Sequence, residues 1–241
     1  MTTENPALPP TLEIAAEVQC YRVIKREFGT DNQRLYDGLD PNPFNDLEWL
    51  SDTIAFYQDG EAVSGRFAPF RSKDGIPVPV LYLAPLKETA YFEAMLRPVG
   101  HDGLRTLEKD YVQNLEAVCL TFDAPLKLAD CRAAYLKGGD EAFWDYTEDE
   151  LFNQTQLKCI KSARALAKHI YDNYPEIDGI VWDSVQHSGC VPCYMLFGKR
   201  RAGKIGHTFG AIVDRASWKP YFYQAAKSGQ VSMAHDLAAL M

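Results

Sequence analysis

The chain has 241 residues, 46% of them hydrophobic and 12% aromatic, so it can bury a large core within one elaborate domain. A net charge of −8 argues against a nucleic-acid-binding module, which needs clustered lysine and arginine. No apolar run approaches the roughly 20 residues that span a bilayer. The opening "MTTENPALPP" lacks the basic and apolar regions of a secretory signal. We therefore expect a cytoplasmic protein whose six cysteines are reduced thiols.

Short strands and irregular segments are expected along the first half of the chain. The expected elements are, in order, a strand ending near residues 21–23, a loop over 30–45, a short helix over 46–58, a strand over 78–84, a helix over 87–97, and strands around 117–122 and 126–128. The loop is rich in Asp, Asn, Gly and Pro, which favour turns. The strand "VPVLYLA" and the helix "KETAYFEAMLR" are separated by the break at Ala84-Pro85.

The second half contains the clearest helix of the chain, over 156–174. Its apolar stripe has helical spacing and consists of Leu157, Ile160, Ala163, Ala167, Ile170 and Tyr171. A short acidic helix is expected over 141–151, and strands over 178–184 and 193–197. The tail over 201–241 has mixed character, and its last ten residues predict a packing helix.

Strands and helices alternate without a regular βαβ rhythm, which predicts an α+β fold with a mixed central β-sheet and flanking helices. We expect a flexible N-terminal arm over 1–17, a main domain over 18–200, and a C-terminal extension over 201–241 packed on the same domain. Neither GxGxxG nor GxxxxGK[ST] occurs, so the common nucleotide-binding fingerprints are missing.

Glu93 does not fit a plain core helix. It shares a helical face with Leu86, Ala90 and Leu96, which points its carboxylate toward the interior. A buried carboxylate is costly unless a charged or hydrogen-bonding group meets it. A structural salt bridge to one arginine would explain it, and so would a catalytic cleft.

Four further polar residues lie at strand ends or inner faces, where active sites are commonly assembled. Arg22 ends the first strand, Arg66 follows a glycine in "SGRF", Tyr82 lies inside "VLYLA", and Ser184 ends "GIVWDS". Each one taken alone has a structural explanation, such as a core aromatic or a turn serine.

Together with Glu93, these residues resemble the RES family, small bacterial toxins named for an Arg, a Glu and a Ser. The matching segments are "CYRVI" at 20–24, "GRF" at 65–67, "VLYLAPLKETAYFEAM" at 80–95, "TQLKCIKSARALAKHI" at 155–170 and "DGIVWDSVQHSGCVPCYMLF" at 178–197. The sequence departs from the pattern at Gln186-His187, where an arginine is expected nearby. The resemblance implies an ADP-ribosyltransferase-like RES fold.

The resemblance also implies that NAD is the substrate. Glu93 would then stabilise the positive charge that develops on the ribose when the nicotinamide bond breaks. Arg22 and Arg66 would bind the pyrophosphate, because guanidinium groups fork onto phosphate oxygens. Tyr82, and also Tyr21, would stack on the nicotinamide or donate a hydrogen bond. Ser184 would bind a ribose hydroxyl or hold Glu93 in place.

The acceptor of the ADP-ribosyl group stays open at this point. Water would make the protein an NAD glycohydrolase, inorganic phosphate an NAD phosphorylase, and a protein side chain an ADP-ribosyltransferase. No resident cofactor and no metal site are expected, because "CVPC" at 190–193 lacks two further ligands at a comparable spacing. A toxin implies a neutralising antitoxin, or an immunity protein if the chain is a delivered effector. The alternative is a non-catalytic module that binds a nucleotide or a protein.

Overall fold

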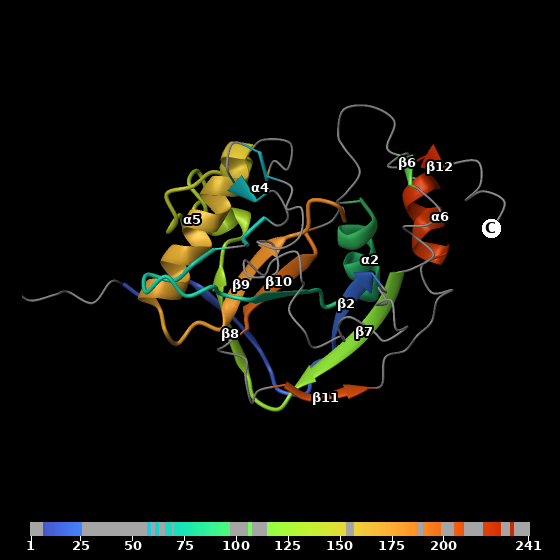
Figure 1. The fold of residues 1–241 in the computed structure, drawn as a ribbon, viewed down its shortest axis with the longest axis horizontal. Helices are drawn as coiled ribbons and strands as arrows, with labels where there is room; N and C mark the ends of the chain where they lie inside the picture. The colour runs from blue at the N-terminus through green and yellow to red at the C-terminus, as the bar shows by residue number, and fades with distance from the viewer. Residues whose placement is uncertain are drawn as a thin grey trace, which may run out of the picture.

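The computed structural model describes residues 7–25, 57–58, 61–62, 66–68, 70–96, 106–107, 115–152, 157–187, 190–198, 205–209, 219–227 and 232–233. Within these residues, a five-stranded sheet lies between a helical layer and a three-stranded sheet. Figure 1 shows helix α5 on one side of strands β8, β9 and β10, with β2, β7 and helix α2 on the other side. None of the helices in the described ranges is both long and apolar enough to cross a membrane.

The larger sheet has the strand order β1-β8-β9-β10-β5. Its strands are β1 (Thr11–Ile14), β8 (Leu126–Asp130), β9 (Gly179–Asp183), β10 (Pro192–Phe197) and β5 (Val80–Leu83). Only β8 and β9 pair in parallel, while the other three pairs are antiparallel, so the sheet is mixed. The middle strands are apolar on both faces, as expected of strands covered on both sides.

The smaller sheet has the order β11-β7-β2 and is antiparallel throughout. Its strands are β11 (Ile205–Phe209), β7 (Leu115–Phe122) and β2 (Cys20–Lys25). Two backbone hydrogen bonds between Tyr21 and Ala84 connect β2 to the residue that follows β5. Short strand pairs complete the described structure: β3 (Tyr57–Gln58) with β4 (Glu61–Ala62), and β6 (Thr106–Leu107) with β12 (Ser232–Met233).

The helices are α2 (Lys87–Leu96), α4 (Glu148–Phe152), α5 (Leu157–Asn173) and α6 (Lys219–Lys227), with a 3₁₀ turn at Ala133–Tyr135. Helix α5 buries Ala163, Ala167 and Ile170 completely, which confirms the middle of the predicted apolar stripe, whereas Ile160 and Tyr171 are half-buried. Thr147 caps α4, because its hydroxyl accepts from the Glu150 N–H while the Glu150 carboxylate accepts from the Thr147 N–H, which together form a capping box.

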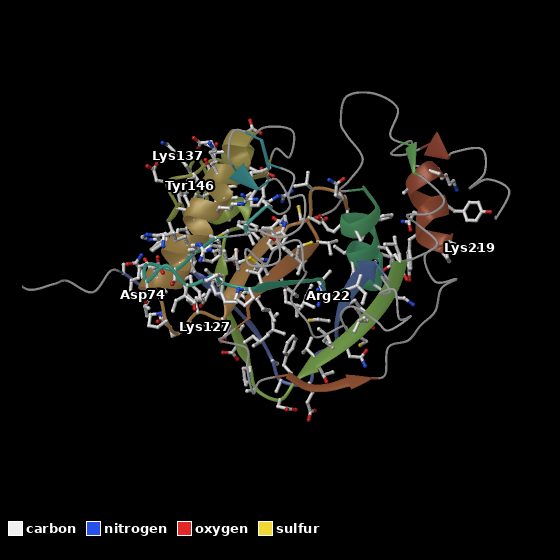
Figure 2. The ribbon with its side chains drawn as sticks, in the orientation of Figure 1. Arg22, Asp74, Lys127, Lys137, Tyr146 and Lys219 are labelled. Atoms are coloured by element: carbon white, nitrogen blue, oxygen red, sulfur yellow. The ribbon has the colours of Figure 1, made fainter. Side chains whose placement is uncertain are left out.

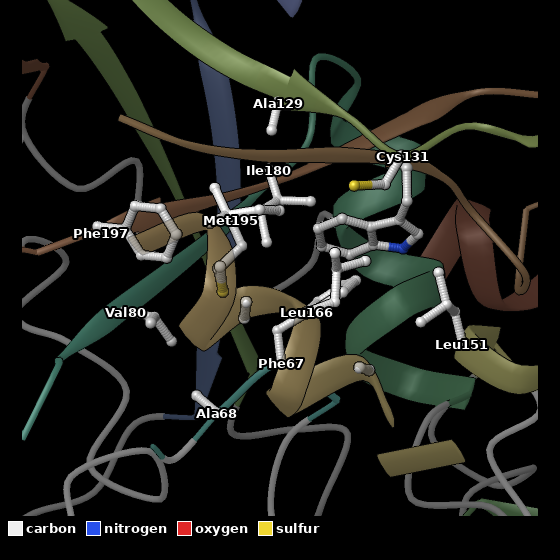
Figure 3. Close-up of a cluster of buried hydrophobic side chains, with 14 of the residues drawn as sticks. Phe67, Ala68, Val80, Ala129, Cys131, Leu151, Leu166, Ile180, Met195 and Phe197 are labelled. Atoms are coloured by element: carbon white, nitrogen blue, oxygen red, sulfur yellow. The ribbon is translucent and has the colours of Figure 1, made fainter. Parts of the chain in front are cut away.

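Two apolar clusters cover the two faces of the larger sheet. Side chains along β5 and β10 alternate between them, so that Met195 and Phe197 face α5 while Leu196 faces the smaller sheet. Figure 3 shows the α5 side, where Leu166 and Phe67 approach Ile180 and Met195. The chain passes between the sheets at 123–125, where β7 ends and β8 begins.

The structure confirms the α+β class, the mixed sheet, the strand near 80–83, helix α2 and helix α5. Two predictions were wrong in part. Residues 11–14, expected within a flexible arm over 1–17, form strand β1 because their backbone completes the edge beside β8. The acidic helix expected over 141–151 is confined to 148–152, since a loop precedes its cap.

The tail contains a helix that the sequence analysis did not predict, α6 at 219–227. Of the packing helix expected over 232–241, residues 232–233 form strand β12, and the rest lies outside the described residues. The loop expected over 30–45 and most of the helix expected over 46–58 also lie outside them. These parts of the prediction are therefore not tested by the structure.

Candidate functional site

Glu93 and Ser184 form the centre of the candidate site. The Ser184 hydroxyl donates a hydrogen bond of 2.6 Å to the Glu93 carboxylate. Glu93 comes from the second turn of α2, and Ser184 is the first residue after β9. The Ser184 N–H donates to the carbonyl of Val191, the residue before β10. The structure therefore joins two residues that lie 91 positions apart in the sequence.

The surroundings of Glu93 differ in part from the predicted helical face. Leu86, expected on the same interior face, is 44% exposed, whereas Thr89 and Tyr91 are fully buried and Phe92 is 4% exposed. Glu93 is half-buried, at the border between this buried face of α2 and solvent. The Ser184 hydroxyl is a hydrogen-bond partner of its carboxylate, so a neutral donor helps to hold this charge at the edge of the core.

A second set of hydrogen bonds fixes the loop that carries Ser184. The backbone N–H of His187 donates to the Ser184 hydroxyl oxygen at 2.9 Å, so the serine proton is directed to Glu93. The His187 ring is hydrogen-bonded through Nδ1 to the Thr89 hydroxyl at 2.8 Å and meets the Phe92 ring edge-on at 4.9 Å. Two positions on α2 thus hold the loop after β9 against the helix.

Tyr82 and Arg66 meet through the segment at 66–68. The Phe67 backbone N–H donates to the Tyr82 hydroxyl at 3.2 Å, which orients the phenol. Arg66 is 7% exposed, and its guanidinium lies 5.1 Å above the centre of the Phe152 ring, a cation–π geometry. Helix α4, which ends at Phe152, thus helps to position this arginine.

Arg22 and Tyr21 point to opposite faces of β2, as consecutive strand residues must. Arg22 is 4% exposed, and Figure 2 places it in the interior, where β2 packs against α2. Tyr21 is half-buried, and its hydroxyl donates to the Gln19 side chain at 3.2 Å on the exposed side. Arg22 lies on the same face of β2 as Cys20 and Ile24, whose side chains belong to the apolar cluster between the two sheets. The Tyr21 hydroxyl instead contacts Gln19.

Cys193 is a neighbour of the site that the sequence analysis treated only as part of a chance CxxC. Burial raises the pKa of its thiol well above the usual value, and the charge of Glu93 raises it further, whereas Ser184 and Arg66 oppose the shift. The thiol is therefore neutral at physiological pH and lies within the electrostatic reach of both Glu93 and Arg66. No local sequence signal identifies Cys193, because the pairing of β9 with β10 is what brings it next to the site.

Trp182 is the second neighbour that the sequence analysis missed. It is 3% exposed and lies two residues before Ser184, directly opposite Cys193 in the β9–β10 pair. Its ring meets Tyr82 edge-on at 6.1 Å and Phe67 at 5.0 Å. A group of three aromatic rings therefore lies next to Ser184 along β9, on the face of the sheet that also carries α5.

The opposite face of the sheet carries a separate charged group at the ends of β8 and β9. The Asp130 carboxylate is buried and accepts two hydrogen bonds from Arg132 Nε, at 2.9 and 3.2 Å. Burial raises the pKa of Asp183, which the Arg132 charge lowers and the Asp130 charge raises again. Asp183 therefore faces this charged group, on the other side of the sheet from Ser184, as expected of consecutive residues along a strand.

Within the described ranges, no three His, Cys, Asp or Glu side chains gather in a way that would hold a metal ion. Five cysteines, Cys20, Cys119, Cys131, Cys190 and Cys193, are free thiols. In the "CVPC" motif Cys190 is exposed and Cys193 is buried, so the two face different environments.

Comparison with known proteins returned two matches. A model of the RES domain matches residues 44–211, a span that includes Arg66, Tyr82, Glu93 and Ser184 and excludes Arg22. A chain in the crystal structure of the M. tuberculosis MbcT–MbcA toxin–antitoxin complex is 13% identical, with 87% of this chain and 91% of that chain covered and a TM-score of 0.49. No curated protein matches the chain.

Proposed function

Because the chain belongs to the RES domain family, we propose that it is an enzyme that consumes NAD by breaking the bond between nicotinamide and ribose. The observation that carries this proposal is the 2.6 Å hydrogen bond from Ser184 to Glu93. It holds a carboxylate in a fixed position at the border of the core, on a helix that also buries Thr89, Tyr91 and Phe92.

Such a carboxylate suits glycosidic cleavage of NAD. As the bond from the ribose anomeric carbon to the nicotinamide nitrogen breaks, positive charge develops on the sugar. A negative group already oriented toward that carbon stabilises the charge without reorganising during the reaction. Glu93 takes this role in the proposal, and Ser184 is the residue that positions it.

Arg66 and Arg22 are proposed to bind the pyrophosphate. Both are nearly fully buried, and a guanidinium presents several donors in a plane that matches phosphate oxygens. The contact of Arg66 with Phe152 fixes the direction of its guanidinium. Tyr82, whose hydroxyl already accepts from Phe67, is proposed to line the nicotinamide end. Tyr21 stays a weaker candidate for the same end, because its hydroxyl bonds Gln19.

The proposed reaction transfers the ADP-ribosyl group of NAD to one acceptor molecule. The electron pair of the broken bond goes to the ring nitrogen, and nicotinamide leaves as a neutral molecule. An oxygen of water or inorganic phosphate forms the new bond to the anomeric carbon and gives up a proton if it carries one. Hydrolysis yields ADP-ribose, and phosphorolysis yields its phosphate ester, while transfer to a protein side chain is the alternative outcome of the test.

Depletion of NAD would make the protein a toxin, so we propose that a neutralising partner protein, an antitoxin or an immunity protein, restrains it in the cell. The test of function begins with purified protein free of such a partner. Nicotinamide release from NAD is measured with and without inorganic phosphate, for the native chain, Glu93→Gln and Glu88→Gln. Glu88 lies on the same helix and gives a matched loss of one charge.

Release that stops in Glu93→Gln and persists in Glu88→Gln supports the proposal, and dependence on phosphate identifies the acceptor. Labelled NAD separates the alternative, because label on a protein band would indicate protein modification. Absence of release and of labelling from a folded native chain would refute the proposal and favour a binding module.

A further inference from the structure

Among the described residues, the indole N–H of Trp182 is a buried hydrogen-bond donor that meets no acceptor. The side chain is 3% exposed, and its Nε1 atom meets no partner within the part of the chain that the structure describes. Buried donors in native proteins are nearly always paired, and leaving one unpaired lowers stability. An unpaired donor beside a candidate active site therefore requires a functional explanation.

A second tryptophan shows what the ordinary arrangement looks like in the same core. Trp144 is also buried, at 5% exposure, and its indole N–H donates to the Asp130 carbonyl oxygen at 2.7 Å. The two residues belong to the same apolar cluster on the α5 side of the sheet. The fold can thus pair an indole in this cluster, and it does not do so at position 182.

The position of Trp182 relative to Ser184 indicates which part of a ligand would meet it. Two residues along β9 bring the side chain to the same face, at a separation of about 6.6 Å along the strand. Ser184 holds the carboxylate where the glycosidic bond would break. Trp182 is more deeply buried than Ser184. A ligand group that adjoins the glycosidic bond and lies farther from solvent would therefore reach the indole.

The neighbours of Trp182 favour a flat, positively charged ring at this depth. Tyr82 is half-buried and meets the indole edge-on, and Phe67 packs against it from the segment that follows Arg66. Aromatic walls attract cationic rings through their quadrupoles. The nicotinamide ring of NAD is cationic before cleavage, and it carries a carboxamide whose oxygen accepts hydrogen bonds.

We propose that the Trp182 indole N–H donates a hydrogen bond to the carboxamide oxygen of the bound nicotinamide ring. The proposal rests on NAD being the substrate, as proposed above. Trp182 then contributes to recognition of the nicotinamide end, distinct from the arginines that bind the pyrophosphate. The contact is made in the ground state and in the transition state alike, so it acts on KM rather than on kcat.

The variant Trp182→Phe tests this contact, and Trp144→Phe is the matched control. Both changes remove the same volume and one N–H from the same cluster. Trp144→Phe also leaves the Asp130 carbonyl without its donor, whereas Trp182→Phe removes a donor that has no partner. Without ligand, the melting temperature of Trp144→Phe should lie lower than that of Trp182→Phe by about 2–4 °C.

In NAD turnover, by contrast, Trp182→Phe should have the larger effect of the two variants. We expect KM of Trp182→Phe to rise about three- to tenfold with kcat within about twofold of the native value, and KM of Trp144→Phe to stay unchanged. An NAD analogue with sulfur in place of the carboxamide oxygen extends the test. With this analogue, KM of the native chain should rise by a similar factor, whereas KM of Trp182→Phe should rise little further.

The Kd of NAD, measured by calorimetry on Glu93→Gln with and without Trp182→Phe, separates this inference from the proposed function. A three- to tenfold weakening by Trp182→Phe supports the contact even where turnover is absent. An unchanged Kd and KM beside normal native turnover overturns the contact and leaves the proposed function standing. No binding and no turnover by the folded native chain overturns both.

Discussion

Replacing Ser184 with alanine isolates the contact that positions the carboxylate. The change removes the 2.6 Å hydrogen bond to Glu93 and the acceptor for the His187 backbone N–H. An O–H donor this close to a carboxylate forms a short, charge-assisted hydrogen bond, with a net value of about 1.5–3 kcal/mol. If that orientation matters fully in the transition state, kcat falls roughly 10- to 150-fold. KM should change little, because the arginines that we assign to the pyrophosphate remain.

The assay is nicotinamide release at saturating NAD, with circular dichroism to verify folding. Ser72→Ala is the control, since Ser72 is a buried serine on a loop remote from the site whose hydroxyl accepts only a weak 3.3 Å contact from the Ile76 N–H. It should retain native kcat. A Ser184→Ala variant with kcat within twofold of the native value would refute the reasoning that Ser184 positions Glu93.

Three further predictions concern the surroundings of the site. Arg66→Lys should raise KM about threefold or more, because lysine loses the planar stack on Phe152 and the forked donors; an unchanged KM would contradict this. Thr89→Val removes the hydrogen bond to His187 and should lower stability by about 0.5–1.5 kcal/mol in urea unfolding, with kcat reduced as the loop loosens. Asp183→Asn should raise the melting temperature at pH 7. Burial raises the pKa of Asp183, so its ionised form destabilises the fold above that folded-state pKa. The gain in melting temperature should vanish below the ordinary aspartate pKa, where the aspartic acid of the native chain and the asparagine of the variant are both neutral. A gain that persists in acid would contradict this.

The residues that the sequence predicted best are those whose pattern is local. Helix α5 follows from its 3.6 spacing, and β5 and β10 follow from short apolar runs bounded by proline and glycine. Strand β1 escaped prediction because its four residues carry no strong alternation and are held by pairing with β8, a contact between residues more than 110 positions apart. Such pairing is decided by tertiary structure rather than by local propensity.

The candidate site shows the same division. Glu93 and Ser184 were identifiable because each is a polar residue at the edge of an apolar element, and the structure brings them within 2.6 Å. Trp182 and Cys193 look like core residues in the sequence, and they are indeed nearly fully buried. What distinguishes them is the pairing of β9 with β10, which sets them side by side next to Ser184. No local pattern encodes that register.

The most direct test of the central claim is nicotinamide release from NAD by the purified chain, measured beside Glu93→Gln. Our account predicts release by the native chain and a loss of at least about 100-fold in Glu93→Gln, because the carboxylate that stabilises the developing charge is gone. Equal rates for the two proteins, or no release by a folded native chain, would contradict the account.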